Sequence, residues 1–209
     1  MGTPHRQAGK ARRGVEAADE PIISSIGDKV ALGPLRRDLI SLYQRWFSDL
    51  EVMRAFADRG PRPTTLEAME SWYNEASKSE SDVYFLIYER ATLRPVGFAD
   101  LSSMEPFHRT AEYDLLIGEK DCWGKGYGTE VTRLVLEYGF TALGLHNILL
   151  GVMSFNEYAV RAYLRAGFKE IGRRREAFRL GGRAYDEIYM DCLATEFRGS
   201  ALTELLPGA

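Results

Sequence analysis

Trp123-Gly-Lys-Gly-Tyr-Gly128 is a glycine-rich stretch between two segments with regular apolar spacing. Residues 112–117 before it are typical of a strand, and residues 129–142 after it have the spacing of an amphipathic helix. A strand, a glycine turn and a helix start in this order let backbone N–H groups point outward at the positive end of the helix dipole. The stretch therefore predicts a binding site for a phosphate or pyrophosphate group.

The two common nucleotide-binding motifs do not fit this stretch. A P-loop needs Gly-Lys-Ser/Thr after a four-residue gap, which is absent here. In the dinucleotide fingerprint the third glycine would come one residue later, and an acidic residue would end a strand about 20 residues on. Taken alone, three alternating glycines are also compatible with a plain tight turn before a helix.

A second informative segment runs from Asn156 to Phe168, NEYAVRAYLRAGF, and begins 28 residues after Gly128. Asn156 is a favourable N-cap for a helix over residues 157–166, and Gly167 is a favourable terminator. Tyr163 follows Asn156 by two helical turns and lies on the same face. By themselves these residues could simply cap and pack the helix.

The other segments alternate between strand-like and helix-like patterns. Thr64 and Glu67 have the spacing of a capping box at the start of a helix. Gly181-Gly182 lies between two strand-like runs and predicts a closing hairpin. This order predicts a mixed α/β (α+β) domain over residues 28–198, between a flexible tail at 1–27 and a C-terminal tail at 199–209. We expect strands at 30–32, 83–88, 96–104, 112–117, 147–152, 173–180 and 184–193, and helices at 38–50, 64–73, 129–142 and 157–166.

Composition narrows the class of protein. The 209 residues include 27 Lys and Arg against 30 Asp and Glu, and 45% are hydrophobic, which is ordinary for a globular chain. The net charge of −3 does not indicate the excess of positive charge that is typical of nucleic-acid-binding proteins. No window of about 18 apolar residues predicts a membrane span, and the N-terminus lacks the apolar core of a secretory signal. We expect a cytoplasmic protein without nucleic-acid or membrane partners; a homo-oligomer stays open.

Together, the two segments resemble the GNAT acetyltransferase superfamily, in which Q/R-x-x-G-x-G/A is followed by an N-x-x-A/S-x-x-x-Y-x-x-x-G-F helix. The resemblance covers about residues 28–197 and is closest to the RimJ/RimL-like branch of polyamine, antibiotic and N-terminal acetyltransferases. His108-Arg-Thr-Ala-Glu112, Trp123 to Glu130 and Met190-x-x-Leu193 resemble that branch. It implies the GNAT fold, a mixed and mostly antiparallel sheet with helices on both faces. Trp123 replaces the usual Gln or Arg, which leaves the pyrophosphate to backbone amides.

The resemblance also implies a use of acetyl-CoA as co-substrate, with no metal. The strand before the glycine stretch would part from its neighbour, and one of its N–H groups would polarise the thioester carbonyl. The pyrophosphate would bind the amides of residues 124–129, and Asn156 would line the cleft near the pantetheine. The residues so predicted to bind acetyl-CoA are Leu115, Leu116, Ile117, Trp123, Gly124, Lys125, Gly126, Tyr127, Gly128, Thr129 and Asn156.

Two proton transfers define the predicted catalytic residues. Tyr163 would donate its proton to the departing CoA thiolate, because a tyrosine is protonated at neutral pH. An alkyl amine with a pKa of about 10.4 is neutral in only about one molecule in 2,500 at pH 7, so the acceptor needs a base. Glu112 is the first candidate, and Asp114 projects from the same strand face. Asp100 and Glu105 are further acidic residues that could attract a cationic acceptor.

The predicted reaction is direct transfer of acetyl to a primary amine in a ternary complex. Cys122 has no recognisable histidine partner, so a covalent acyl-enzyme is not expected. His108 is a candidate for substrate contact. The expected acceptor is a small molecule, either a polyamine or an amino-bearing antibiotic or metabolite. The alternatives are a protein N-terminal α-amine as acceptor, a bulkier acyl donor, and a non-catalytic acyl-CoA-binding module.

Overall fold

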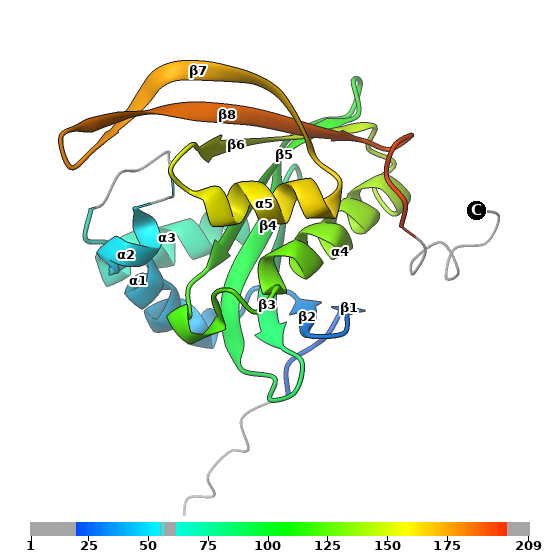
Figure 1. Cartoon of the computed structure of the whole chain (residues 1–209). Coiled ribbons are helices and arrows are strands. Elements are labelled where there is room, and N and C mark those ends of the chain that lie inside the picture. The colour runs from blue at the N-terminus through cyan, green and yellow to red at the C-terminus, as the bar shows by residue number, and fades with distance from the viewer. Residues whose placement is uncertain (1–19, 55, 57–61, 200–209) are drawn as a thin grey trace, which may run out of the picture.

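The computed structural model describes residues 20–54, 56 and 62–199, and within them eight strands form one sheet (Figure 1). The strand order is β1-β2-β3-β4-β5-β6-β8-β7. Every neighbouring pair is antiparallel except β5 and β6, which run parallel. The strands are β1 (Ser25–Ile26), β2 (Val30–Gly33), β3 (Val83–Glu89), β4 (Pro95–Glu105), β5 (Thr110–Ile117), β6 (Asn147–Met153), β7 (Lys169–Leu180) and β8 (Arg183–Leu193).

Helices cover both faces of the sheet, as predicted. One face packs on α4 (Tyr127–Thr141) and α5 (Glu157–Ala166). The other face packs on α1 (Ile40–Ser48), α2 (Leu50–Met53) and α3 (Leu66–Ala76). The side chains between the sheet and α4 and α5 form the first core, and those between the sheet and α1, α2 and α3 form the second core. Along β4 the side chains alternate between them: Phe98 belongs to the second core, and Ala99 and Leu101 belong to the first. Two short 3₁₀ helices, η1 (Arg37–Leu39) and η2 (Lys120–Cys122), complete the described elements.

The parallel strands β5 and β6 pair over three residues only and then part. Their pairing runs from Thr110–Asn147 to Glu112–Leu149. Beyond that point β5 stays paired with β4 as far as Ile117, whereas β6 stays paired with β8 as far as Met153. The facing edges of both strands are therefore free of each other, which is the parting that the family resemblance implied.

Several predicted boundaries needed correction. The structure caps α3 with Thr65, whose hydroxyl accepts a hydrogen bond from Ala68 N, rather than with Thr64. The predicted helix over 38–50 is interrupted at Asp49, whose carboxylate caps the separate helix α2. Helix α4 begins at Tyr127 instead of residue 129, because Gly126 with a φ of 88° already serves as its N-cap.

The folded sheet also begins before residue 28, inside the predicted N-terminal tail. Ser25 and Ile26 pair with Leu32 and Ala31 through a turn that starts at Gly27. The apolar Ile23 packs against the second core, so these residues have hydrophobic contacts that their polar neighbours conceal in the sequence. Residues 1–19 and 200–209 of the predicted tails lie outside the described residues.

Gly97 sets the approach of β4 to β5. A Cβ at this position would lie 2.0 Å from the carbonyl oxygen of Leu116, which is backbone and cannot rotate away. We expect Gly97→Ala to lower the free energy of unfolding by about 3 kcal/mol, because the strands must separate to admit the methyl group. Urea denaturation measures this change. Gly172→Ala on β7 is the matched control, since nothing lies within 4 Å of its added Cβ; equal losses in both variants would contradict the steric explanation.

Candidate active site

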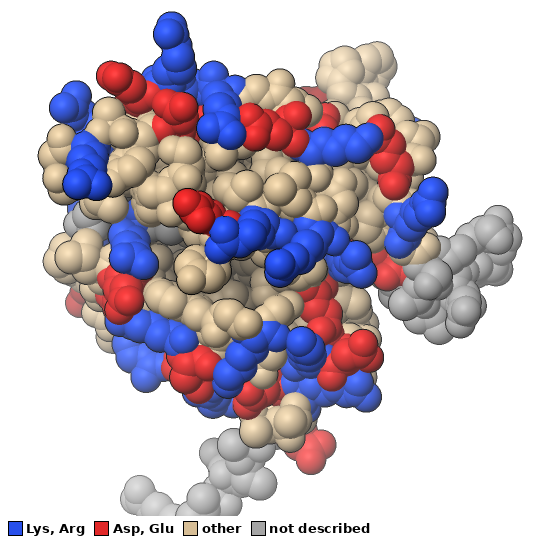
Figure 2. Space-filling view, in the orientation of Figure 1, with Lys and Arg blue, Asp and Glu red and all other residues tan. Residues whose placement is uncertain are grey.

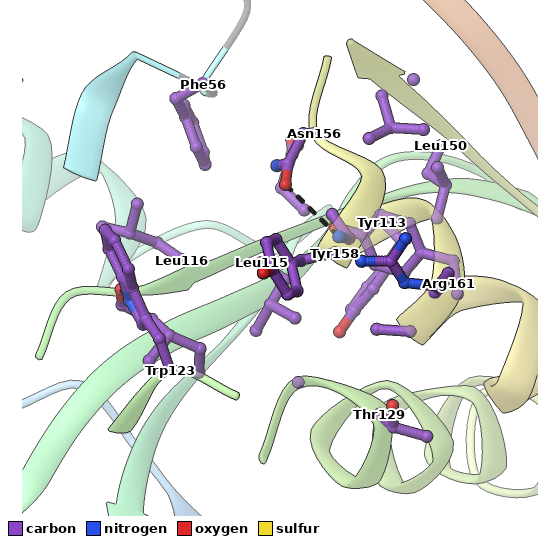
Figure 3. A pocket seen from close by; sticks show the side chains of 18 of the residues that line it. Phe56, Tyr113, Leu115, Leu116, Trp123, Thr129, Leu150, Asn156, Tyr158 and Arg161 are labelled. Carbon is purple, nitrogen blue, oxygen red and sulfur yellow. Dashed lines mark hydrogen bonds between the residues drawn. The ribbon is translucent and has the colours of Figure 1, made fainter. Parts of the chain in front are cut away.

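A cavity of about 880 Å³ opens where β5 and β6 part. Figure 3 shows Leu115 inside this space, with Trp123 and Leu116 towards one side and Asn156 and Arg161 towards the other. All three predicted catalytic residues line it. Every residue predicted to bind acetyl-CoA lines it as well, apart from Lys125, which is not among the lining residues. One cavity thus brings together predicted site residues that are up to 51 positions apart in the sequence, from Glu112 to Tyr163.

The glycine stretch presents main-chain donors at the start of α4. Gly124 and Gly126 have backbone φ angles of 74° and 88°, which residues other than glycine rarely adopt. Among the described residues, no protein atom accepts a hydrogen bond from the N–H groups of residues 124–129. Because α4 is 15 residues long, these donors coincide with the positive end of a full helix dipole. This arrangement suits an anion such as a pyrophosphate.

Hydrogen bonds to the start of β2 and the end of β5 hold this stretch in place. Glu130 accepts hydrogen bonds from the backbone N–H groups of Lys29 and Val30, at 2.8 and 3.3 Å. Lys29 Nζ donates to the carbonyl oxygen of Lys125 at 2.9 Å. Trp123 donates from its indole Nε1 to the carbonyl oxygen of Ile117 at 2.8 Å. Trp123 thus ties the turn to the end of β5, a contact for which the sequence carried no signal.

Helix α5 places Asn156 and Tyr163 on the cavity. Asn156 Oδ1 accepts a hydrogen bond from Ala159 N at 3.3 Å, as expected for an N-cap (Figure 3). Tyr163 is 8% exposed and packs edge-on against Tyr113 and Phe168. Burial, and secondarily the Asp114 carboxylate, raise the pKa of Tyr163 well above its usual value. Its hydroxyl therefore stays protonated through the neutral pH range, as a proton donor requires.

Carboxylates gather on the opposite side of the sheet. Glu112 and Asp114 alternate with the buried Tyr113 on β5, so they project to the face that carries α1, α2 and α3. Asp114 lies directly opposite Asp100 on β4, and Asp100 is only 6% exposed. Burial and the neighbouring Asp114 raise the pKa of Asp100 to about 8, against a lowering by a hydrogen bond with Ser102. The buried Asp100 therefore holds a proton at neutral pH beside the half-buried Asp114.

The two sides of the cavity carry opposite charges. The helix α5 side contributes Arg161 and Arg165, and Figure 2 shows basic side chains gathered over α5 and α4. The α2, β5 and β8 side contributes four carboxylates and one cation, Arg54; the carboxylates are Glu51, Glu112, Asp114 and Glu187. An anionic donor and a cationic acceptor can thus approach from different sides and meet at the parted strands.

Several lining residues come from segments that the sequence did not connect with the site. Val52 lies on α2, Phe56 lies three residues after its end, and Glu187 and Tyr189 lie on β8. Their distance along the chain from the two motifs leaves no local signal. Conversely, His108 is absent from the lining, and its ring packs edge-on against Phe107. Cys122 lines the cavity, but burial raises the pKa of its thiol, and Arg94 lies 3.2 Å from its sulfur.

A comparison of the sequence with known families matches an acetyltransferase (GNAT) domain over residues 29–169. The chain belongs to the GNAT acetyltransferase family. It is similar to spermidine N(1)-acetyltransferase of Vibrio cholerae, with 31% identity over 133 residues, which are 64% of this chain and 76% of that protein. It is likewise similar to human alpha/beta-tubulin-N-acetyltransferase 9, with 31% identity over 160 residues, which are 70% and 75% of the two chains.

The fold is also similar to a solved structure, the spermidine N-acetyltransferase of Vibrio cholerae in complex with CoA and spermine. The TM-score is 0.74 at 27% sequence identity, and the match covers 80% of this chain and 97% of the other. The protein is accordingly an acetyl-CoA-dependent N-acetyltransferase. Among the described residues there is no group of three or more His, Cys, Asp or Glu side chains that could hold a metal ion. The described helices are all too short or too polar to cross a membrane.

The pKa of Asp100 predicts how stability depends on pH. A carboxyl whose pKa rises from its ordinary value near 3.9 to about 8 on folding binds more protons in the folded state between these values. The free energy of unfolding therefore falls as the pH rises from about 4 to 8. We expect Asp100→Asn to be more stable than the unmodified protein, by a margin that grows by at least about 1 kcal/mol from pH 5 to pH 8.

Urea unfolding at pH 5, 6.5 and 8 measures this margin. Asp28→Asn serves as the control, because Asp28 is exposed in the turn between β1 and β2. A margin for Asp100→Asn that stays constant with pH would show that the carboxyl is already ionised in the folded protein.

Proposed function

We propose that this enzyme acetylates a primary amine of a polycationic small molecule, of the polyamine class. The observation that carries the proposal is the charge of the cavity, basic on the α5 side and acidic on the α2, β5 and β8 side. A polyamine is a flexible cation, and carboxylates favour its binding over that of neutral or anionic amines. The relatives named for spermidine, and the solved relative that holds CoA and spermine, support the same acceptor class.

For the acyl donor, we propose that the amides of residues 124–129 bind the pyrophosphate of acetyl-CoA and that Asn156 lies beside the pantetheine. The free edge of β5 then offers N–H groups of Leu115, Leu116 or Ile117 to the thioester carbonyl oxygen. Such a donor stabilises the negative charge that develops on this oxygen when the amine attacks. The basic Arg161 and Arg165 on α5 favour the phosphates of the donor over an uncharged thioester.

The proposed chemistry takes two protons from the acceptor nitrogen and gives one proton to the departing thiolate. The acceptor arrives as an ammonium ion and loses a proton to Glu112 or Asp114, directly or through water. Its nitrogen lone pair attacks the thioester carbon and forms the C–N bond. The nitrogen gives up its second proton to water, which carries it to solvent, and the C–S bond breaks. The CoA thiolate takes a proton from the Tyr163 hydroxyl, and water returns the proton from the carboxylate to the phenolate. The products are the N-acetylamine and free CoA.

A panel of acceptors tests the proposed substrate class. Purified enzyme with acetyl-CoA is assayed for thiol release with spermidine, spermine, an aminoglycoside, an amino acid and a peptide that has a free N-terminus. We expect the highest kcat/KM for the polyamines. A preference for the peptide would instead favour a protein N-terminal α-amine as acceptor; one relative is named for a protein, tubulin. The predicted cytoplasmic location and the homo-oligomer stay predictions.

Tyr163→Phe tests the proposed acid. Loss of the hydroxyl removes the proton source for the thiolate, so kcat should fall at least about 100-fold. The CoA dissociation constant, measured by calorimetry, should stay within twofold, because the ring and its packing are retained. Tyr138→Phe is the matched control: Tyr138 is a tyrosine of α4 that packs on Phe85, away from the cavity. Full activity of Tyr163→Phe would remove the acid role, and a protein that binds CoA without any turnover would be a binding module.

A further inference from the structure

Glu187 is a carboxylate on the acceptor side of the cavity for which neither sequence motif accounts. It lies on β8 next to Ile188, whose side chain packs with α4 and α5 in the first core. Because side chains alternate along a strand, Glu187 and Tyr189 project to the other face of the sheet, where Glu112 and Asp114 also project. All four residues line the same cavity.

The contacts of Glu187 leave one of its oxygens available. Tyr189 Oη donates a hydrogen bond to Oε2 at 2.9 Å, and Arg174 Nη1 lies 3.8 Å from the same oxygen. The side chain of Arg174 is 69% exposed, so solvent weakens this ion pair. Among the described residues, Oε1 accepts no hydrogen bond. The Glu187 side chain is only 17% exposed, and a partly buried charge of this kind is stabilised by a cationic partner.

Gly151 on β6 makes room for this free oxygen. A Cβ at Gly151 would lie 2.8 Å from Glu187 Oε1, so any other residue would displace the carboxylate. Gly151 follows Leu149, the β6 partner of Glu112, by two residues. With a rise of about 3.3 Å per residue and about 4.8 Å between strands, the backbone positions of Glu112 and Gly151 are about 8 Å apart. The Glu187 carboxylate lies against Gly151, so Glu112 and Glu187 belong to different positions along the parted strands, which suits two amino groups joined by a short alkyl chain.

We propose that Glu187 determines specificity for acceptors with a second cationic group. Its Oε1 binds the distal ammonium of a di- or polyamine while the reacting amine lies beside Glu112 and Asp114, and Tyr189 positions the carboxylate. This inference rests on the proposed polyamine function and adds to it a second subsite with its own residue. The alkyl chain between the two amines would lie along the parted edge of β6.

Glu187→Gln removes the charge and keeps the shape. The experiment measures KM for spermidine and for a monoamine of matched chain length, with the unmodified protein and with the variant. We expect the variant to raise the KM of spermidine about tenfold more than that of the monoamine, because only the former has a distal charge. Glu170→Gln is the control: Glu170 is a carboxylate of the same hairpin that bonds to Arg173 outside the cavity.

Two further variants separate recognition from structure. Glu187→Lys should reverse the preference, so that a primary amine with a distal carboxylate becomes a better acceptor than a diamine. Gly151→Ala should reproduce the loss of Glu187→Gln, since it displaces Oε1 without changing charge. Equal changes for spermidine and the monoamine, with no reversal in Glu187→Lys, would overturn the Glu187 subsite while polyamine acetylation stands. Failure of the unmodified protein to acetylate any di- or polyamine would overturn the proposed function and the subsite together.

Discussion

The parting of β5 from β6 is the constraint on which the rest of this structure depends. Unpaired strand edges are normally a liability, because their N–H and C=O groups need partners. Here β4 holds β5 on one side and β8 holds β6 on the other, so both strands stay extended after their shared pairing ends at Glu112 and Leu149. The exposed main chain then lines the cavity, where an acyl thioester can supply the missing partner.

The two faces of the sheet carry different chemistry beside the cavity. On one face, main-chain donors at the start of α4 and arginines on α5 suit an anionic cofactor. On the other face, a carboxylate lies at alternate positions of β5 and again on β8. The pair Asp100 and Asp114 holds a proton within this acidic surface, which limits the charge that the fold must bury. In the proposed arrangement, amine and thioester meet at the opening between the strands.

Contacts between the helices and the loop before α4 connect the two sides mechanically. Trp46 on α1 donates from Nε1 to Glu119 Oε1 at 2.8 Å, and Arg45 forms an ion pair with the same carboxylate. Gly118 lies so close to Trp46 that a Cβ would come within 2.5 Å of its ring atoms. Helix α1 is thereby held to the segment that leads into the glycine turn before α4. A rigid connection of this kind would keep the proposed substrates aligned with the parted strands.

Short-range pattern in the sequence was sufficient for the glycine turn, the Asn156 cap, the bounds of α5 and the hairpin at Gly181-Gly182, because caps and turns depend on residues a few positions apart. It missed the first four residues of β7, which begins at Lys169 and not at residue 173. It was insufficient where two adjacent threonines competed for one cap, and Thr65 rather than Thr64 was used. Only the tertiary structure placed Asp100 opposite Asp114, and Glu187 over Gly151. These contacts join residues 14 and 36 positions apart, and strand register and packing decide such contacts, which no local periodicity encodes.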